Sequence, residues 1–139
     1  MEIELYRAKR ADNHDWVYGP YAFYASNKGL KRAIYTGTDL GYVIPVEVVP
    51  DTVCRCAGIR DIDGTAIFKG DILEISYDDG TAYRTEVRAY GSTLCVDVEG
   101  GDYDFTAIDF AVDDWNDNCC KCKVIGNVFD NPELLEACK

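Results

Sequence analysis

The feature that most limits the fold of this chain is the spacing of its apolar residues, which alternate with polar ones over short runs. The alternation is clearest in 71–77 (DILEISY), which a turn at 78–80 (DDG) joins to a second run at 82–90. A period of two residues is typical of β-strands with one buried face, and Asp-Gly accepts the positive φ that tight hairpins need. We therefore predict a β-hairpin here, with 82–90 as one continuous return strand.

The first half of the chain shows the same pattern in shorter pieces. We expect strands at 16–18 and 21–24 around Gly19-Pro20, and a turn at 26–29 before a strand at 33–35. The β-branched runs beside Pro45 and Pro50 are confined to sheet edges or strand ends, because proline cannot donate to a strand ladder.

The last part of the chain adds a hairpin around Gly100-Gly101 and a strand over 122–129 with a bulge or close approach at Gly126. A helix is predicted over 131–138, because Asn131 suits an N-cap and Pro132 the first helical position. Short strands with one terminal helix predict a mainly β fold. We expect a small barrel-like or sandwich arrangement, an SH3-like barrel being one form of it.

The chain is 139 residues long, which suits a single domain over 1–139. A change from a Tyr-rich first half to a hairpin-rich second half marks the only candidate boundary, near Pro50. It would divide the domain into an N-terminal β lobe, 1–50, and a β-barrel core with the C-terminal helix, 51–139.

Negative charge is concentrated in one segment. The chain has 25 acidic and 14 basic residues, a net charge of −11, and residues 71–117 alone hold 13 acidic residues against Arg84 and Arg88. Such a balance disfavours nucleic-acid binding, which needs clustered Lys and Arg. The segment is either a solvated face or an acidic surface for a basic partner. The candidate interaction face consists of Asp97, Glu99, Asp102, Asp104, Asp113 and Asp114.

The seven cysteines are expected to be reduced thiols, because their number is odd and no export signal accompanies them. We also expect no membrane span and a cytoplasmic location in the host cell. Two clusters still offer a metal alternative, since alternate cysteines on neighbouring strands share a face. The candidate ligands are Cys54, Cys56, Cys120 and Cys122.

Catalytic patterns are missing from the sequence. His14 is the one histidine and lies in a polar turn, and no nucleophile elbow, phosphate loop or zinc-protease motif occurs. Lys28, Lys31 and Arg32 lie beside tyrosines, as in single-strand binders, but the first 70 residues carry no net positive charge, which favours core aromatics with solvated basic residues. We expect a protein that is not an enzyme and uses no cofactor.

Three ordered blocks resemble the YopX-like family of phage and prophage proteins. They are 6–19 (YRAKRADNHDWVYG), 49–72 (VPDTVCRCAGIRDIDGTAIFKGDI) and 123–135 (KVIGNVFDNPELL). The resemblance implies a phage- or prophage-encoded, mostly β protein with a barrel-like part, and it brings no established activity, ligand or catalytic residue. The usual glycine and aromatic residue of the middle block are replaced here by Cys54 and Cys56.

Together these features predict a protein-interaction module that uses its acidic region, 71–117, to bind a basic host or phage protein. Two alternatives remain: a metal-binding or enzymatic module using the cysteines or the carboxylate hairpin, and a DNA-mimic inhibitor of a nucleic-acid-binding host protein. The sequence leaves the oligomeric state open, although edge strands and exposed tyrosines could pair between subunits.

Overall fold

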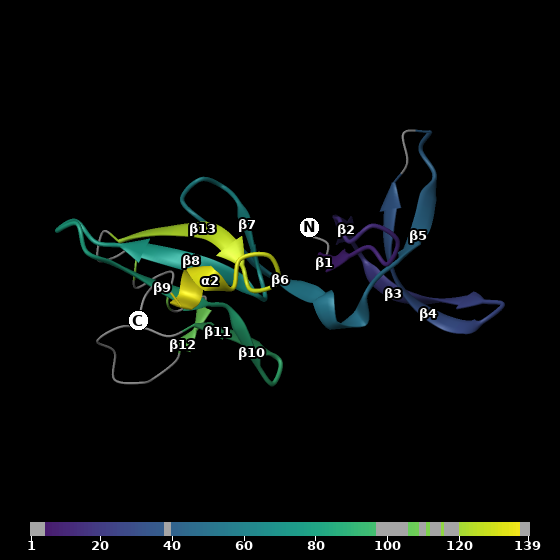
Figure 1. The fold of residues 1–139 in the computed structure, drawn as a ribbon. Coiled ribbons are helices and arrows are strands. Elements are labelled where there is room, and N and C mark those ends of the chain that lie inside the picture. The colour runs from purple at the N-terminus through teal and green to yellow at the C-terminus, as the bar shows by residue number, and fades with distance from the viewer. Residues whose placement is uncertain are drawn as a thin grey trace. The chain divides into compact units, whose positions relative to one another are not determined.

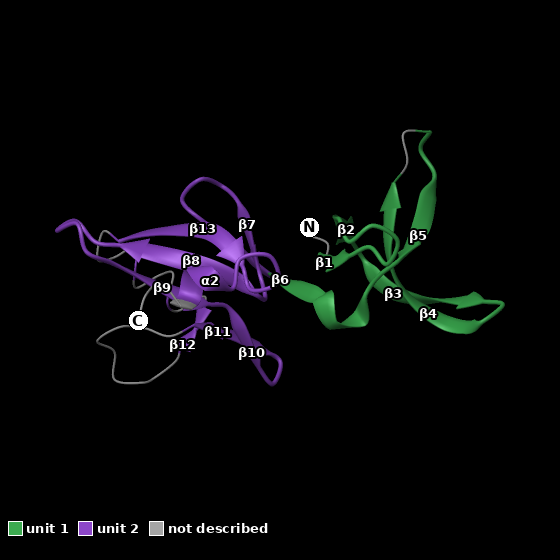
Figure 2. Cartoon of the chain, in the orientation of Figure 1, with its two compact units in different colours: residues 1–56 green, residues 57–139 purple. Residues whose placement is uncertain are grey.

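The computed structural model describes residues 5–37, 40–96, 106–108, 111, 115 and 120–136. The chain forms two compact units, Met1–Cys56 (unit 1) and Ala57–Lys139 (unit 2), coloured separately in Figure 2. The sequence placed this boundary near Pro50. The structure places it later, because Cys54 and Arg55 already pair with the first strand of unit 1.

The described elements are mostly short strands (Figure 1). They are β1 (Tyr6–Lys9), β2 (Trp16–Gly19), β3 (Tyr21–Ser26), β4 (Gly29–Gly37), β5 (Val43–Glu47), a 3-10 turn η1 (Pro50–Thr52), β6 (Cys54–Arg60), β7 (Ala66–Phe68), β8 (Asp71–Ser76), β9 (Ala82–Glu86), β10 (Arg88–Tyr90), β11 (Thr93–Val96), β12 (Thr106–Ala107), β13 (Lys121–Asn127) and the helix α2 (Glu133–Glu136). The mainly β fold with a short C-terminal helix is confirmed. The described strands form open sheets, in the orders β2-β1-β6-β7, β3-β4-β5, β13-β8-β9 and β10-β11-β12, and none of these sheets closes into a barrel.

Unit 1 consists of the β1–β2 hairpin and the three-stranded sheet β3-β4-β5, both antiparallel. The two short strands predicted around Gly19-Pro20 are β2 and β3. Pro45 lies in β5, which is an edge strand as predicted. The β3–β4 and β4–β5 hairpins extend as separate arms of this unit (Figure 1). Its core consists of Ala8, Val17, Ile34, Val46 and Val48.

Unit 2 is organised around β8, which pairs with β9 on one side and β13 on the other. The predicted Asp-Gly hairpin joins β8 to β9, and Gly80 takes the expected positive φ of 90°. The bulge predicted at Gly126 is also present, since the β13–β8 register shifts between Val124 and Gly126. The unit's core consists of Ile67, Leu73, Ile75, Val87, Leu94, Val96, Ile108, Ala111, Trp115, Cys120 and Cys122.

The return strand predicted over 82–90 is interrupted at Val87. Residues 82–86 pair with β8, whereas 88–90 pair with β11 in another sheet. Val87 is fully buried, donates its N–H to the Asp71 carbonyl at 2.9 Å and accepts from the Gly70 N–H at 2.8 Å. These bonds hold Val87 against the turn before β8, so that the chain passes there from one sheet to the next.

The C-terminal helix begins later than predicted, at Glu133, and residues 137–139 lie outside the described part. Asn131 accepts a hydrogen bond from the Asn127 N–H at 3.3 Å through Oδ1, so its side chain secures the turn that precedes α2. A Cβ added at Gly126 would lie 2.7 Å from that Oδ1 and 2.8 Å from Leu134 Cδ1. Gly126 therefore allows α2 to pack directly on β13.

Helical backbone at three described residues of the acidic segment was not predicted. Ile108, Ala111 and Trp115 have helical backbone and are buried in the core of unit 2. Their spacing of three and four residues is that of one helix face. Trp115 Nε1 donates to the Tyr83 hydroxyl at 3.2 Å, which connects Trp115 to β9.

Candidate functional site

The predicted acidic face lies outside the described residues. This applies to all six of its carboxylates: Asp97, Glu99, Asp102, Asp104, Asp113 and Asp114. The structure does describe the beginning of the acidic segment, and there the carboxylates differ in role. Asp71 is 1% exposed and accepts from the Phe68 N–H at 2.7 Å, so it supports the fold rather than a surface.

The division of the chain into units sharpens the charge distribution. Unit 1 contains seven acidic and seven basic residues, so it carries no net charge. Unit 2 contains 18 acidic and seven basic residues, so it carries the whole net charge of −11. The imbalance is thus a property of one compact unit.

Several basic residues of unit 2 are occupied within it. Arg84 lies 3.2 Å from Glu74 Oε2 and donates to the Leu134 carbonyl at 3.0 Å, which satisfies the C-terminal end of α2. Lys123 lies 3.8 Å from Asp63, and Arg60 donates to the Gly64 carbonyl at 2.8 Å. These guanidinium and ammonium groups act in turns and on the helix end, and the seven basic residues of the unit are outnumbered by its 18 acidic ones.

The turn between β8 and β9 presents two carboxylates, Asp78 and Asp79, at the surface. Asp79 Oδ1 accepts from the Thr81 hydroxyl at 2.6 Å and from the Thr81 N–H at 2.9 Å. These hydrogen bonds lower the pKa of Asp79, which keeps the carboxylate ionised. This turn is therefore a well-defined negative feature among the described residues of unit 2.

The candidate metal ligands divide between the units: Cys54 and Cys56 belong to unit 1, and Cys120 and Cys122 to unit 2. Cys54 Sγ lies 3.2 Å from the Thr52 carbonyl, within the turn before β6. Burial, aided by the charge of Asp61, raises the pKa of Cys122 to about 12, so its thiol stays protonated. Within the described residues no three His, Cys, Asp or Glu side chains gather to hold a metal.

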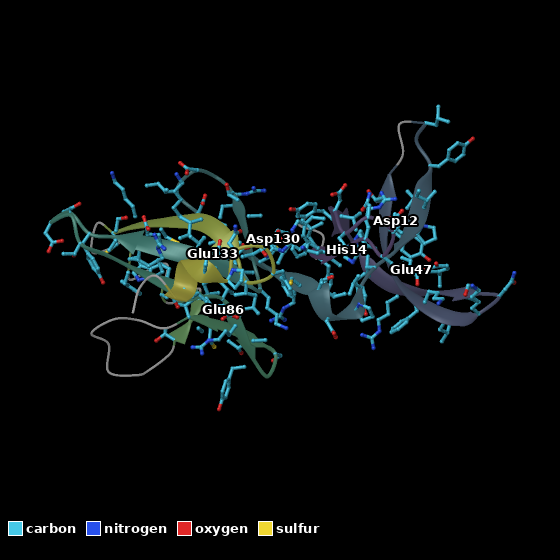
Figure 3. All side chains as sticks on the ribbon, viewed as in Figure 1. Asp12, His14, Glu47, Glu86, Asp130 and Glu133 are labelled. Carbon is cyan, nitrogen blue, oxygen red and sulfur yellow. The ribbon has the colours of Figure 1, made fainter. Side chains whose placement is uncertain are left out.

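Two other candidate features also have local explanations. Lys31 pairs with Glu47 at 3.7 Å, while Arg32 lies over the Phe23 ring at 5.8 Å. As successive residues of β4, Lys31 and Arg32 point to opposite faces of the sheet and do not form one basic stripe. His14 lies in an exposed turn, as predicted, with a φ of 64°; His14 and Asp12 are labelled in unit 1 in Figure 3.

Exposed apolar side chains on the hairpin arms of unit 1 were not singled out as a site from the sequence. They are Phe23, Leu30, Leu40, Tyr42, Val43 and Ile44, with exposed fractions from 43% to 83%. The sequence pattern that could have revealed them is the alternation of apolar and polar residues. It predicts that one face of each strand is apolar, but not whether that face is covered by the rest of the protein. Unit 2 adds a small cavity of about 200 Å³, lined by Arg88, Ala89, Tyr90 and Cys95. No helix among the described residues is long and apolar enough to cross a membrane.

Comparisons with known proteins agree with the fold. The model of a family described as YopX protein matches residues 5–136. The crystal structure of protein YopX from Bacillus subtilis is similar to this chain, with 25% sequence identity and a TM-score of 0.62. That similarity covers 97% of this chain and 99% of the Bacillus chain. A search of curated proteins found no significant match.

Proposed function

The chain belongs to the YopX family, and from that premise we propose that it is a non-enzymatic, phage- or prophage-encoded protein that binds a basic protein in the host cytoplasm. The binding determinant is the negative charge of unit 2. The observation that carries the proposal is the segregation of charge: −11 on residues 57–139 and zero on residues 1–56. A field confined to one unit steers a partner of opposite sign towards that unit.

The internal contacts of unit 2 support binding of a basic partner. Arg84 and Lys123 already contact Glu74 and Asp63, and Asp79 is held ionised at an exposed turn. We place the main contact on the acidic segment 71–117, with Asp97, Glu99, Asp102, Asp104, Asp113 and Asp114 as its principal carboxylates. A basic partner exchanges their hydration and counterions for direct ion pairs, so its binding must weaken with salt.

A charge-matched pair of variants tests the proposal. The first neutralises four residues of the proposed face, as D97N, E99Q, D102N and D104N. The control neutralises four carboxylates of unit 1, as D12N, D15N, D39N and D51N. Both variants change the net charge equally. Affinity capture from host lysate should recover a basic protein with the wild type and with the control but not with the first variant; equal loss in both variants would refute a face-specific contact.

A DNA-mimic inhibitor is a narrower form of the same proposal, and the same charge favours it. Its partner would be a host protein that binds nucleic acid through a basic surface. Double-stranded DNA should then displace the captured partner in competition. A partner that binds DNA and this chain simultaneously would exclude mimicry while leaving the acidic contact intact.

A further inference from the structure

Strand β3 is an edge strand whose outer side no other described strand pairs with. Ser26 and Gly29 pair across the two-residue turn at 27–28, which makes 26/29, 24/31 and 22/33 the hydrogen-bonded pairs of the hairpin. The Tyr35 N–H donates to the Pro20 carbonyl at 3.0 Å, so 20/35 continues the same series of hydrogen-bonded pairs. The backbone N–H and C=O groups of the alternate residues Tyr21, Phe23 and Ala25 therefore point away from β4.

The side chains of β3 carry no charge, and three of them, Ala22, Phe23 and Ala25, are apolar. Strand β3 reads YAFYAS, and Phe23 is 58% exposed. Phe23 and Ala25 lie opposite Arg32 and Leu30 of β4, so the four side chains share one face of the sheet. Leu30 is 75% exposed, so apolar side chains reach the end of the arm on the face that also carries Arg32.

The opposite edge of the same sheet is protected in ways that β3 is not. Strand β5 contains Pro45, which has no N–H to offer, and the charged Glu47, whose carbonyl accepts from the Ala11 N–H at 3.0 Å. Soluble proteins commonly block edge strands with proline or charge to prevent pairing with another chain. Since β3 has neither device, its outer edge is available for strand addition.

We propose that β3 pairs with β3 of a second copy of this chain, antiparallel, about a two-fold axis at Phe23. In this register Phe23 lies opposite Phe23 of the partner subunit, and Tyr21 lies opposite Ala25 of the partner subunit. All outward N–H and C=O groups of the three alternate residues then find partners in both copies. The contact is isologous, so it closes as a dimer of two three-stranded sheets joined into one.

Charge favours a second copy over the basic partner proposed for unit 2. Unit 1 has no net charge and β3 contains no ionisable group except its two tyrosines, so this edge offers a basic protein no complementary field. A second copy supplies an equally uncharged strand. Because the axis relates β3 to itself, the same six residues make the contact in both copies. Pairing one six-residue strand buries less than about 1,200 Å² in total, the size of weak and transient interfaces. We expect a dimer that dissociates on dilution through the micromolar range.

The dimer is independent of the proposed function, and salt separates the two. Contact between unit 2 and a basic partner weakens as salt is added. Self-association through β3 is maintained or strengthened, because salt screens the repulsion between two units of −11. Failure of either proposal therefore leaves the other standing.

Sedimentation equilibrium of the full chain from about 5 μM to about 500 μM tests the pairing at ordinary salt. We expect the wild type to shift from monomer to dimer over this range. F23K and F23E should each weaken dimerisation at least about tenfold, since each loses an apolar cross-strand pair and opposes like charges at the axis. An equimolar mixture of F23K and F23E should regain the dimer, because opposite charges then meet. V43K is the control, replacing an apolar residue of β5 that is also exposed (69%, against 58% for Phe23), and should dimerise as the wild type does.

Two results would overturn the pairing. One is a wild type that stays monomeric at the highest concentration. The other is a dimer that V43K disrupts as strongly as F23K, or that the F23K and F23E mixture fails to regain. Far-UV circular dichroism of each variant confirms that the sheet is retained, which the exposure of Phe23 leads us to expect.

Discussion

Replacing Asp61, a buried carboxylate in the turn after β6, should destabilise unit 2. Its Oδ1 accepts from the Asp63 and Thr65 N–H groups at 2.9 and 2.8 Å, and its Oδ2 accepts from the Val124 N–H at 2.9 Å. The residue is 9% exposed. One carboxylate thus holds the turn between β6 and β7 and attaches it to β13.

The size of the effect follows from these three bonds. D61A removes all of them, and while the two turn N–H groups can reach water, the half-buried Val124 N–H cannot do so easily. Hydrogen bonds to charged groups contribute about 1.5–3 kcal/mol each, less the hydration regained, so we expect a loss of about 2–4 kcal/mol. D61N keeps one acceptor oxygen but turns an amide N–H₂ towards a backbone donor, for a loss of about 1–2 kcal/mol. The exposed neighbour provides the control: D63N should cost less than about 0.5 kcal/mol.

Urea unfolding followed by tryptophan fluorescence can report on unit 2 alone. The chain's two tryptophans lie in different units, Trp16 in unit 1 and the buried Trp115 in unit 2. In a W16F background, D63N should have the highest urea midpoint, D61N a lower one and D61A the lowest. The dependence of the unfolding free energy on urea concentration should be the same in all three. A D61A midpoint equal to that of the background, or equal losses for D61N and D63N, would refute the role given to Asp61.

Two further predictions concern the packing of unit 2. G126A should lower the free energy of unfolding by about 1–3 kcal/mol, measured by calorimetry or urea unfolding, because the new Cβ would overlap Asn131 and Leu134. G37A is the control and should be close to neutral, because the nearest atom to its new Cβ is 3.9 Å away. Equal losses of stability in the two variants would contradict the close approach of α2. The pKa of Cys122 is about 12 in the fold against an ordinary 9.0, so its protonated thiol contributes stability in full below about pH 9 that is lost between pH 9 and 12. C122V should therefore lose less stability than the wild type when unfolding is measured across that range, and an identical alkaline decline in both would show that Cys122 is not the group responsible.

Local residue chemistry predicted the elements that depend on it. The Asp-Gly turn after β8, the edge position of Pro45 and the bulge at Gly126 each follow from what one residue allows its own backbone to do. The mainly β fold and the C-terminal helix follow from apolar period and from Pro132. None of these features requires knowledge of distant contacts.

The missed features depend on contacts made across the chain. The break at Val87 arises from bonds to Gly70 and Asp71, 16 or more residues away, which no strand pattern encodes. The helical spacing of Ile108, Ala111 and Trp115 lies within an acidic stretch, so charge masked the apolar period. For the candidate site, the sequence located the charge but not its confinement to one unit, which needs the boundary at Cys56.

The most direct test of the acidic contact is the salt dependence of affinity for the captured partner, measured with the wild type and the D97N, E99Q, D102N and D104N variant. We predict that the Kd of the wild type rises at least about tenfold between about 50 and 200 mM salt, as expected for several ion pairs at an exposed surface. The variant should bind weakly at both salt concentrations. A Kd that does not change with salt, or a variant that binds as tightly as the wild type, would contradict a contact through the negative charge of unit 2.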